Sequence, residues 1–382
     1  MRSSGDNASS ANSVYGCSIA GGGCVVIEDS QACGNIAGNN AQGFHVSGLV
    51  SGITPESNLV LPTNSVSFLR CVGSGNTATF ENIGGTLTPG QFQISCGFQL
   101  VFCNGATLID CDAIDNTFIT DQLNPDPTFS AAAVGVNIAG LDPVMPLNVE
   151  IQGLHASNNT LNATVGAAGL YGSDGVLIFG NLVQNISITD SVITQNSDFL
   201  NPSPTRLDSG IALVSPFPAS FNPLITVSNC LISNHASAGI LANAFPETNI
   251  QDNEISANGF GVLLIDSGCS SVLHNTFLHN RLAAVLDTMV PSTSLVAGNN
   301  AFDNGIGGSF TGNCYSVAYP FGPAPVTSSD LTVGFPPLPT VSGENIEVRG
   351  ACTRTKSKAD DVDVEALMLN AQKWLKHFKA VW

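Results

Sequence analysis

One short pattern recurs along most of this chain and restricts its fold more than any other feature. The pattern alternates apolar and polar residues and closes on an asparagine, as in ATLIDCDAIDN (106–116), ISITDSVITQN (186–196) and ITVSNCLISN (225–234). Copies of it close at Asn35, Asn76, Asn116, Asn159, Asn196, Asn234, Asn258, Asn280 and Asn304. Such repetition indicates units that stack on one another, because a single unit cannot bury its own apolar face.

A short apolar strand that begins with glycine follows most of the closing asparagines. Examples are GVLIF (175–179), GILA (239–242) and GVLLI (261–265). Each unit therefore predicts three short strands of alternating pattern joined by turns. The last units are only 22–24 residues long, which is too short for a strand–helix–strand unit and suits one coil of an all-β solenoid.

Over residues 25–320 the chain resembles the right-handed parallel β-helix repeat proteins of the pectin-lyase-like type, including NosD-like proteins. The resemblance rests on the repeated copies and implies a right-handed parallel β-helix of about nine coils. It implies an extracellular or cell-envelope location. It implies no single activity, because this scaffold carries lyases, hydrolases, adhesins and tail proteins.

Equivalent residues of successive coils should stack in columns along the rod. Apolar positions such as Ile27, Leu108 and Val227 should face the interior. The closing asparagines should occupy turns where a left-handed backbone is tolerated, with their amides bonded along the axis. If the residue after each glycine faces inward, an apolar stripe faces outward and needs a cover. That stripe holds Leu177, Phe179, Leu241, Leu263, Ile265 and Leu286.

Four segments follow from this organisation. Residues 1–24 form an N-terminal cap or disordered lead, 25–320 the β-helix, 321–350 a Pro-rich linker or edge segment, and 351–382 a C-terminal helix. The helix is predicted from apolar residues at helical spacing in VDVEALMLNAQKWLKHFKAVW (362–382). It should cover the apolar stripe or cap the last coil, and docking to a partner or a membrane surface is the alternative.

The first coils are longer than the last ones. Extra residues at 120–132, 160–174 and 197–209 follow the same turn and should project from one side of the rod. Loops on a rigid scaffold often carry function, whereas neutral decoration is the other interpretation.

Charge excludes some functions. Residues 1–350 contain five Arg, no Lys and 25 Asp and Glu, so they cannot neutralise a nucleic-acid backbone. The same excess of acidic residues disfavours a lyase that acts on acidic polysaccharide, because such an enzyme needs cations near the substrate. No apolar run is long enough for a transmembrane helix, and no signal peptide is visible. The chain is therefore cytosolic, or an exported form whose signal is lost.

Cysteines and histidines give no metal motif. Cys71, Cys111 and Cys230 share one repeat position with Ser30 and Ser191, which favours a small buried stacking site over a redox motif. One or two disulfides would form if the protein is exported, with a connectivity that the sequence does not reveal. The six histidines are scattered, which indicates surface positions rather than zinc ligands.

The densest group of carboxylates lies in LIDCDAIDN (108–116). Asp110 and Asp112 are the candidate acid and base of a glycosidase-like site. Asp110 shares its repeat position with Asp29 and Asp190, so a role in forming the turn is the stronger interpretation. We predict no cofactor, with Ca²⁺ bound by these oxygens as a weaker option.

Three functions remain open. The first is a noncatalytic secreted or surface scaffold that binds glycan or protein through loops of the first five coils. The second is a glycan-active enzyme that uses the carboxylates of coil three. The third is a homo-oligomeric fibre or adhesin-like module that associates through the apolar stripe or the C-terminal helix.

Overall fold

The computed structural model describes most of the repeat region. The described residues are 2–4, 13–20, 24–47, 65–80, 92–101, 105–120, 130–140, 147–163, 170–180, 183–196, 208–214, 224–245, 247–288, 294–302, 304 and 313–315. Within them the chain forms strands and turns and no helix. The predicted linker (321–350) and C-terminal helix (351–382) lie outside the described residues.

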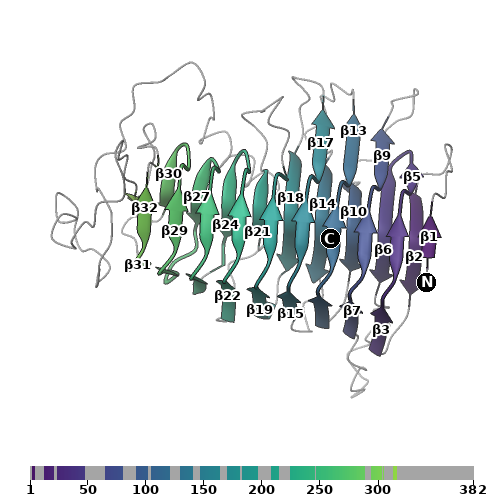
Figure 1. Ribbon diagram of the computed structural model, residues 1–382, viewed down its shortest axis with the longest axis horizontal. Helices are drawn as coiled ribbons and strands as arrows, with labels where there is room; N and C mark the ends of the chain where they lie inside the picture. The colour runs from purple at the N-terminus through teal and green to yellow at the C-terminus, as the bar shows by residue number, and fades with distance from the viewer. Residues whose placement is uncertain are drawn as a thin grey trace, which may run out of the picture.

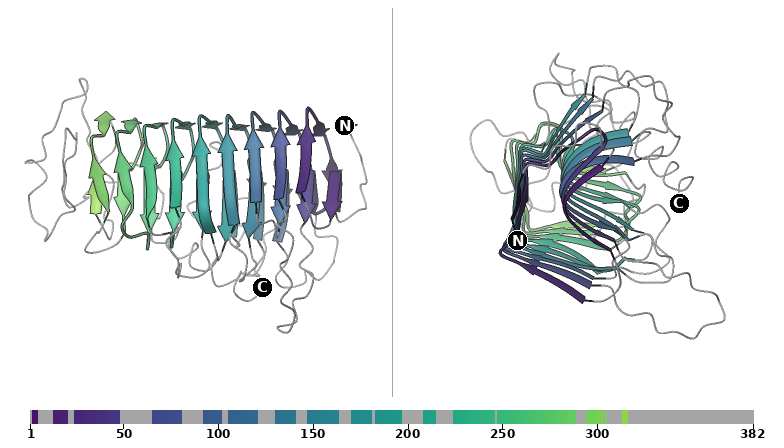
Figure 2. Two further views of the ribbon diagram at one scale, coloured as in Figure 1. Left: turned by 90° about the horizontal axis from the view of Figure 1, so that it is seen from below. Right: turned by 90° about the vertical axis from the view of Figure 1, so that its right-hand side faces the viewer.

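The predicted right-handed parallel β-helix is confirmed: three long sheets run along the stack and enclose a common interior (Figures 1 and 2). Sheet I contains β3 (Cys24–Glu28), β7 (Ser65–Leu69), β11 (Gly105–Ile109), β15 (Leu147–Gln152), β19 (Val183–Thr189), β22 (Leu224–Ser228), β25 (Thr248–Gln251), β28 (Ser271–Leu273) and β31 (Leu295–Ala297). Sheet II contains β1 (Arg2–Ser4), β4 (Gln31–Cys33), β8 (Val72–Ser74), β12 (Asp112–Ile114), β16 (His155–Ser157), β20 (Val192–Thr194), β23 (Leu231–Ser233), β26 (Glu254–Ser256), β29 (Thr276–Leu278) and β32 (Asn300–Phe302).

Sheet III follows sheet II within each coil and then leads to sheet I of the next. It contains β2 (Ser13–Ala20), β6 (Asn40–Ser47), β10 (Phe92–Val101), β14 (Ser130–Gly140), β18 (Leu170–Gly180), β21 (Ser209–Val214), β24 (Ala238–Asn243), β27 (Phe260–Ile265), β30 (Ala283–Asp287) and β33 (Asn313–Tyr315). Its pairings are parallel except the last, in which β33 runs antiparallel to β30. We number the coils one to nine from β3 to β31.

A fourth sheet, which the sequence did not predict, occurs in the first four coils. Sheet IV contains β5 (Ile36–Ala37), β9 (Thr77–Phe80), β13 (Thr117–Thr120) and β17 (Thr160–Ala163). These strands continue beyond sheet II, and the label positions in Figure 1 place them along one edge of the N-terminal half. The residues predicted as loops at 120–132 and 160–174 therefore include regular strands, and β14 and β18 begin inside them.

The interior is formed by alternate residues of sheets I, II and III. Ile151, Ile188 and Val227 are fully buried neighbours in successive coils. In the early coils, Phe44, Phe68 and Phe98 pack together, and the rings of Phe44 and Phe98 stack at 5.2 Å. Because one column repeats in every coil, each apolar residue is buried by the coils on either side of it.

Glycines at equivalent positions of successive sheet III strands form a column along the rod. The column contains Gly16, Gly43, Gly97, Gly135, Gly175, Gly210, Gly239 and Gly261. A Cβ on Gly135 would lie 2.5 Å from the carbonyl oxygen of Gly175, and one on Gly210 would lie 2.6 Å from that of Gly239. At these positions the backbones of successive coils approach too closely for a side chain, which explains why glycine recurs there.

The stack begins before residue 25, so the predicted N-terminal lead (1–24) needs correction. β1 pairs with β4 in sheet II, and β2 pairs with β6 in sheet III. The reason lies in SVYGCSIA (13–20), whose glycine and alternating residues match the later strands of sheet III.

Candidate functional site

Two tight turns recur in each coil, and both have one residue with a left-handed backbone. The first turn lies between sheets I and II, and the second follows sheet II. At the second turn the left-handed residue is Asp115, Asn158, Gln195, Asn234, Ala257 or His279, with φ between 54° and 63°. The ladder asparagine is the next residue, so it lies directly after the left-handed position of its turn.

The asparagines of the second turn form hydrogen-bonded ladders along the rod. The Nδ2 of Asn76 donates to Oδ1 of Asn116 at 2.7 Å, and the same bond links Asn116 to Asn159 at 2.8 Å. A backbone carbonyl accepts the other proton, as Gly73 does from Asn116. Members that the structure places in these ladders are Asn35, Asn76, Asn116, Asn159, Asn196, Asn258, Asn280 and Asn304. They are fully buried, and the ladder bonds satisfy their amides except at Oδ1 of Asn35, the first member, which has no hydrogen-bond partner among the described residues.

Asn234 is not a ladder residue, which corrects one assignment. His235 takes the position instead: its backbone N–H donates to Oδ1 of Asn258 at 3.0 Å, and its Nε2 lies 3.1 Å from the carbonyl of Ile193. Burial lowers the pKa of His235 to about 4, although backbone hydrogen bonds with Ile193 and Asn196 oppose that shift. This histidine is therefore buried and neutral, contrary to the expected surface position.

The first turn has a buried column of its own. Its members are Ser30, Cys71, Cys111, Leu154, Ser191, Cys230, Asn253, Asn275 and Asn299, all nearly inaccessible. The small buried stacking site predicted for the cysteines is therefore observed. In the last coils the column becomes a second asparagine ladder, in which Asn253 donates to Asn275 at 2.9 Å and Asn275 to Asn299 at 3.1 Å.

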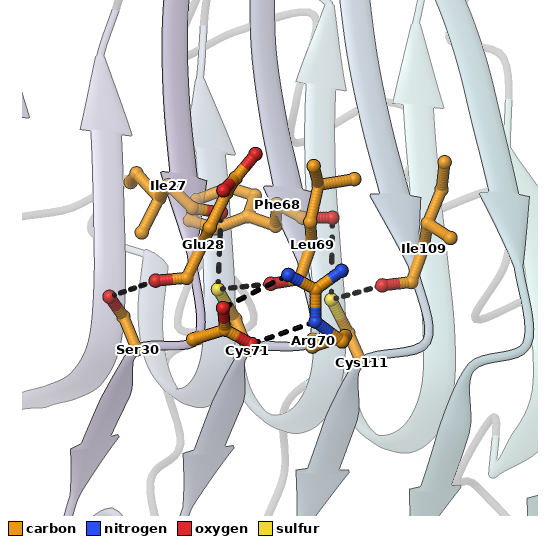
Figure 3. Close-up of polar contacts among 10 residues, drawn as sticks. Ile27, Glu28, Ser30, Phe68, Leu69, Arg70, Cys71, Ile109 and Cys111 are labelled. Carbon is orange, nitrogen blue, oxygen red and sulfur yellow. Dashed lines mark hydrogen bonds and ion pairs between the residues drawn. The ribbon is translucent and has the colours of Figure 1, made fainter.

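Asp110 lies at the surface of the first turn, in the left-handed position with φ of 52°. Its equivalents Asp29 and Arg70 in the preceding coils form a two-point ion pair, with Nε to Oδ1 at 2.7 Å and Nη2 to Oδ2 at 2.9 Å (Figure 3). The hydrogen bond from Arg70 lowers the pKa of the Asp29 carboxyl. Asp110 therefore occupies the turn-forming position.

Asp112 begins β12 and is half-exposed on the outer face of sheet II. Its Oδ1 lies 3.5 Å from Nδ1 of His155, the equivalent residue of the next coil. Nothing in the described residues joins Asp110 and Asp112 in one acid–base arrangement. Much of the predicted loops at 120–132 and 160–174, namely residues 121–129 and 164–169, lies outside the described residues.

A column on the outer face of sheet III changes character along the rod. In register from the first strand it contains Ser18, His45, Gln99, Asn137, Leu177, Ala212, Leu241, Leu263 and Leu286. It is polar through coil three and apolar from coil four. The expected outward register is thus correct, and the apolar members form buried clusters separate from the interior core.

The polar patch, defined as Tyr15, Gln42, His45, Gln99 and Asn137, is internally hydrogen bonded. Nδ1 of His45 lies 2.8 Å from Oε1 of Gln42, and Nδ2 of Asn137 donates to Oε1 of Gln99 at 2.9 Å. The rings of Tyr15 and His45 lie 4.7 Å apart, and Tyr15 is 37% exposed. Burial lowers the pKa of His45, so the patch is uncharged at neutral pH.

Sequence reasoning missed the polar patch, although a signal was present. The residue two places after each column glycine changes from His45, Gln99 and Asn137 in GFH, GFQ and GVN to Leu177 in GVL. Aligning the strands on their glycines, rather than the units on their asparagines, would have revealed the change.

Two buried aspartates, Asp174 and Asp208, lie between coils four and five, where sheet IV ends. The N–H of Ser209 donates to Oδ1 of Asp174 at 3.0 Å, and that of Ser173 donates to Oδ1 of Asp208 at 2.9 Å. The hydroxyl of Ser173 accepts from the N–H of Leu161 on the edge strand β17 at 2.8 Å. Burial raises the pKa of Asp174, and so does the charge of Asp208. The Ser173 hydroxyl thus supplies a bond to β17 that a further strand of sheet IV would supply, and the two aspartates bond to sheet III.

Comparison with known proteins agrees with this architecture. A family model described as periplasmic copper-binding protein (NosD) matches residues 137–318. The coils within that range are NosD-like. No curated protein and no solved structure matches the chain. The NosD-like match begins at Asn137, so it covers the apolar part of the outer column and only the last residue of the polar part.

The family description names copper, and a copper site would require several side-chain donor atoms close together. In the part of the chain that the structure describes, no group of three or more His, Cys, Asp or Glu could hold a metal ion. In the matched range, Cys230 and His235 are buried in separate columns. The described residues therefore do not fit a copper site. No helix among them is long and apolar enough to cross a membrane.

Proposed function

We propose that this protein is an extracytoplasmic, noncatalytic β-helix scaffold that binds a neutral glycan through the polar patch of its first coils. The observation that carries the proposal is the change along the outer column of sheet III, from His45, Gln99 and Asn137 to leucine and alanine. A change confined to one end of an otherwise regular stack needs a reason beyond folding, because apolar residues serve the same position in later coils.

The chemistry of the patch favours an uncharged, hydroxyl-rich ligand. Tyr15 and the neutral imidazole of His45 present ring faces and hydrogen-bonding atoms together. The buried amides of Gln42, Gln99 and Asn137 hold their neighbours in fixed positions. The patch has no cation to attract an acidic polysaccharide, and the surrounding body is acidic.

The periplasmic description of the NosD family supports a location outside the cytoplasm. Copper forms no part of the proposal, since the described donor atoms do not gather into a metal site.

A glycan array that contains both neutral and acidic oligosaccharides tests the proposal. Binding to neutral members is expected, and Tyr15→Ala and His45→Ala should each weaken it by about tenfold or more, the effect of losing a stacked ring or a hydrogen bond in a binding site. His155→Ala is the matched control, because it removes a half-exposed histidine from sheet II. Equal binding by all three variants, or a preference for acidic members, would contradict the proposal.

A further inference from the structure

Two cysteines occupy the same position of consecutive coils. Cys71 and Cys111 follow the left-handed residues Arg70 and Asp110 at the first turn, and the N–H of Asp112 donates to the carbonyl of Cys71 at 2.9 Å. Neighbouring strands in a sheet lie about 4.8 Å apart. Disulfides join Cα atoms that are about 4.4–6.8 Å apart, so equivalent positions of adjacent coils meet that requirement.

The thiols lie beneath the turn and share one environment. The Cys71 thiol is 3.3 Å from the carbonyl of Ile27 and 3.4 Å from that of Leu69. The Cys111 thiol is 3.5 Å from the carbonyl of Phe68, in the coil of Cys71, and 3.4 Å from that of Ile109. Figure 3 shows the two sulfur atoms in neighbouring coils, each bonded to backbone carbonyls.

The two thiols affect one another chemically. The pKa of Cys71 is lowered to about 7, chiefly by a hydrogen bond with Cys111, while the pKa of Cys111 is raised. A thiolate is the species that attacks a disulfide. Cys71 is therefore the member suited to react first, and Cys111 is the member suited to resolve the product.

Other described cysteines are aligned with different residue types. Cys24 and Cys33 lie beside the hydroxyls of Ser65 and Ser74 in the next coil. Cys230 lies in the column between Ser191 and Asn253. In the described part of the chain, only Cys71 and Cys111 occupy equivalent positions of adjacent coils.

We propose that Cys71 and Cys111 form a disulfide that joins coil two to coil three when the protein meets an exogenous disulfide. The Cys71 thiolate attacks one sulfur of the reagent, forms a mixed disulfide and releases one thiolate. The Cys111 thiol gives up its proton, and its sulfur attacks that of Cys71, releasing the second thiolate. The two cysteines are oxidised, the reagent is reduced to two thiols, and the protons end on the released groups.

The reagent must reach a buried pair, so the first turn has to open. The exposed Asp29–Arg70 ion pair at the surface of this turn stabilises it only weakly. Opening must also break backbone hydrogen bonds such as the one from the N–H of Arg70 to the carbonyl of Ile109 at 2.9 Å. The disulfide would join two positions that are 40 residues apart in the chain. It should therefore raise the denaturant midpoint of the protein.

Incubation of the folded full chain with oxidised glutathione, followed by alkylation and peptide mass mapping, tests the proposal. A peptide linked through Cys71 and Cys111 is expected, and reduction with dithiothreitol should remove it. Cys111→Ser should retain glutathione on Cys71, because the resolving thiol is absent. Cys230→Ser is the matched control, since it changes the same column without affecting the linkage.

Absence of the linked peptide in the folded protein would overturn the proposal, as would linkage of Cys71 to another cysteine. A Cys111→Ser chain that is folded by circular dichroism yet carries no glutathione on Cys71 would overturn the order of attack. The experiment needs no glycan, so its outcome is independent of the binding proposal.

Discussion

The first four coils and the last three meet the same packing requirement with different residues. In the late coils both turns carry asparagine, with Asn253, Asn275 and Asn299 at the first turn and Asn258, Asn280 and Asn304 at the second. In the early coils the first turn carries serine, cysteine or leucine, and sheet IV widens the coil. The late coils are thus built from the fewest residues, and they rely on buried amides at two of their corners.

The difference between early and late coils indicates which positions of the scaffold tolerate variation. The asparagine ladder of the second turn and the glycine column run through both regions, so they set the shape of a coil. The first turn, the outer column of sheet III and the connections between strands differ between regions. The NosD-like match covers mainly the more regular coils, and the polar patch lies almost entirely before it.

The largest effect is expected in a feature that both regions share. Gly135→Ala places a Cβ 2.5 Å from the carbonyl oxygen of Gly175, and the backbone of two coils would have to separate. A loss of about 3 kcal/mol or more in the free energy of unfolding is expected. Guanidinium unfolding measures it. Gly105→Ala is the control, because its Cβ would meet only the side chain of Ser65 at 3.2 Å; similar losses in both variants would refute the close-approach explanation.

The second prediction compares the stability contributed by a late first turn, which carries asparagine, with that contributed by an early one, which carries cysteine. Asn275→Ala should cost about 2–4 kcal/mol, because Asn253 loses the acceptor for its N–H and amide, and the carbonyl of Ile250 loses a donor. Cys111→Ala should cost only about 1 kcal/mol, since a small thiol is replaced by a methyl group. Urea unfolding of both variants gives the comparison. Equal costs would mean that the late turns gain nothing from their amides.

The third effect concerns His235, where the second-turn ladder is interrupted. Its pKa is about 4 in the folded chain, against an ordinary value of 6.5. The unfolded chain therefore binds a proton first as pH falls, and stability should decline between pH 6.5 and pH 4 by up to about 3 kcal/mol. His235→Asn should continue the ladder and remove this contribution. Denaturant unfolding at pH 7 and pH 4 measures it, and an unchanged pH dependence in the variant would refute the assignment.

The smallest effect is expected at the surface of the first turn. Arg70→Gln removes the exposed ion pair with Asp29, and thermal unfolding should be unchanged within error, because solvent screens such pairs. The pKa of Asp29 should nevertheless return towards its ordinary value. An NMR titration of Asp29 measures that change. A marked fall in melting temperature would show that the early turn depends on charge after all.

The sequence predicted the strands, the inward columns and the outward register of sheet III, because each is repeated in every coil. It did not identify which residue of the second turn takes the left-handed conformation. That residue varies between Asp115, Gln195, Ala257 and His279, whereas the asparagine after it recurs. The conformation is set by the turn as a whole, so it does not require one residue type.

Sheet IV and the polar patch escaped prediction for another reason. β9, β13 and β17 have four residues each, which is too few for a clear alternation. The patch depends on spatial neighbours such as His45 and Gln99, which are 54 residues apart in the chain. Only the register of sheet III brings them together.

The direction of the asparagine ladder has a consequence for how such a rod can change in length. Each linked amide donates towards the coil that follows it, from Asn35 to Asn76 and again from Asn280 to Asn304. A whole unit that runs from one asparagine to the next can therefore be duplicated or removed with every donor still facing an acceptor. Removal of residues 259–280 would join Asn258 to the residues that now follow Asn280. Length is thus a property that this chain can alter in steps of one coil without redesigning its interior.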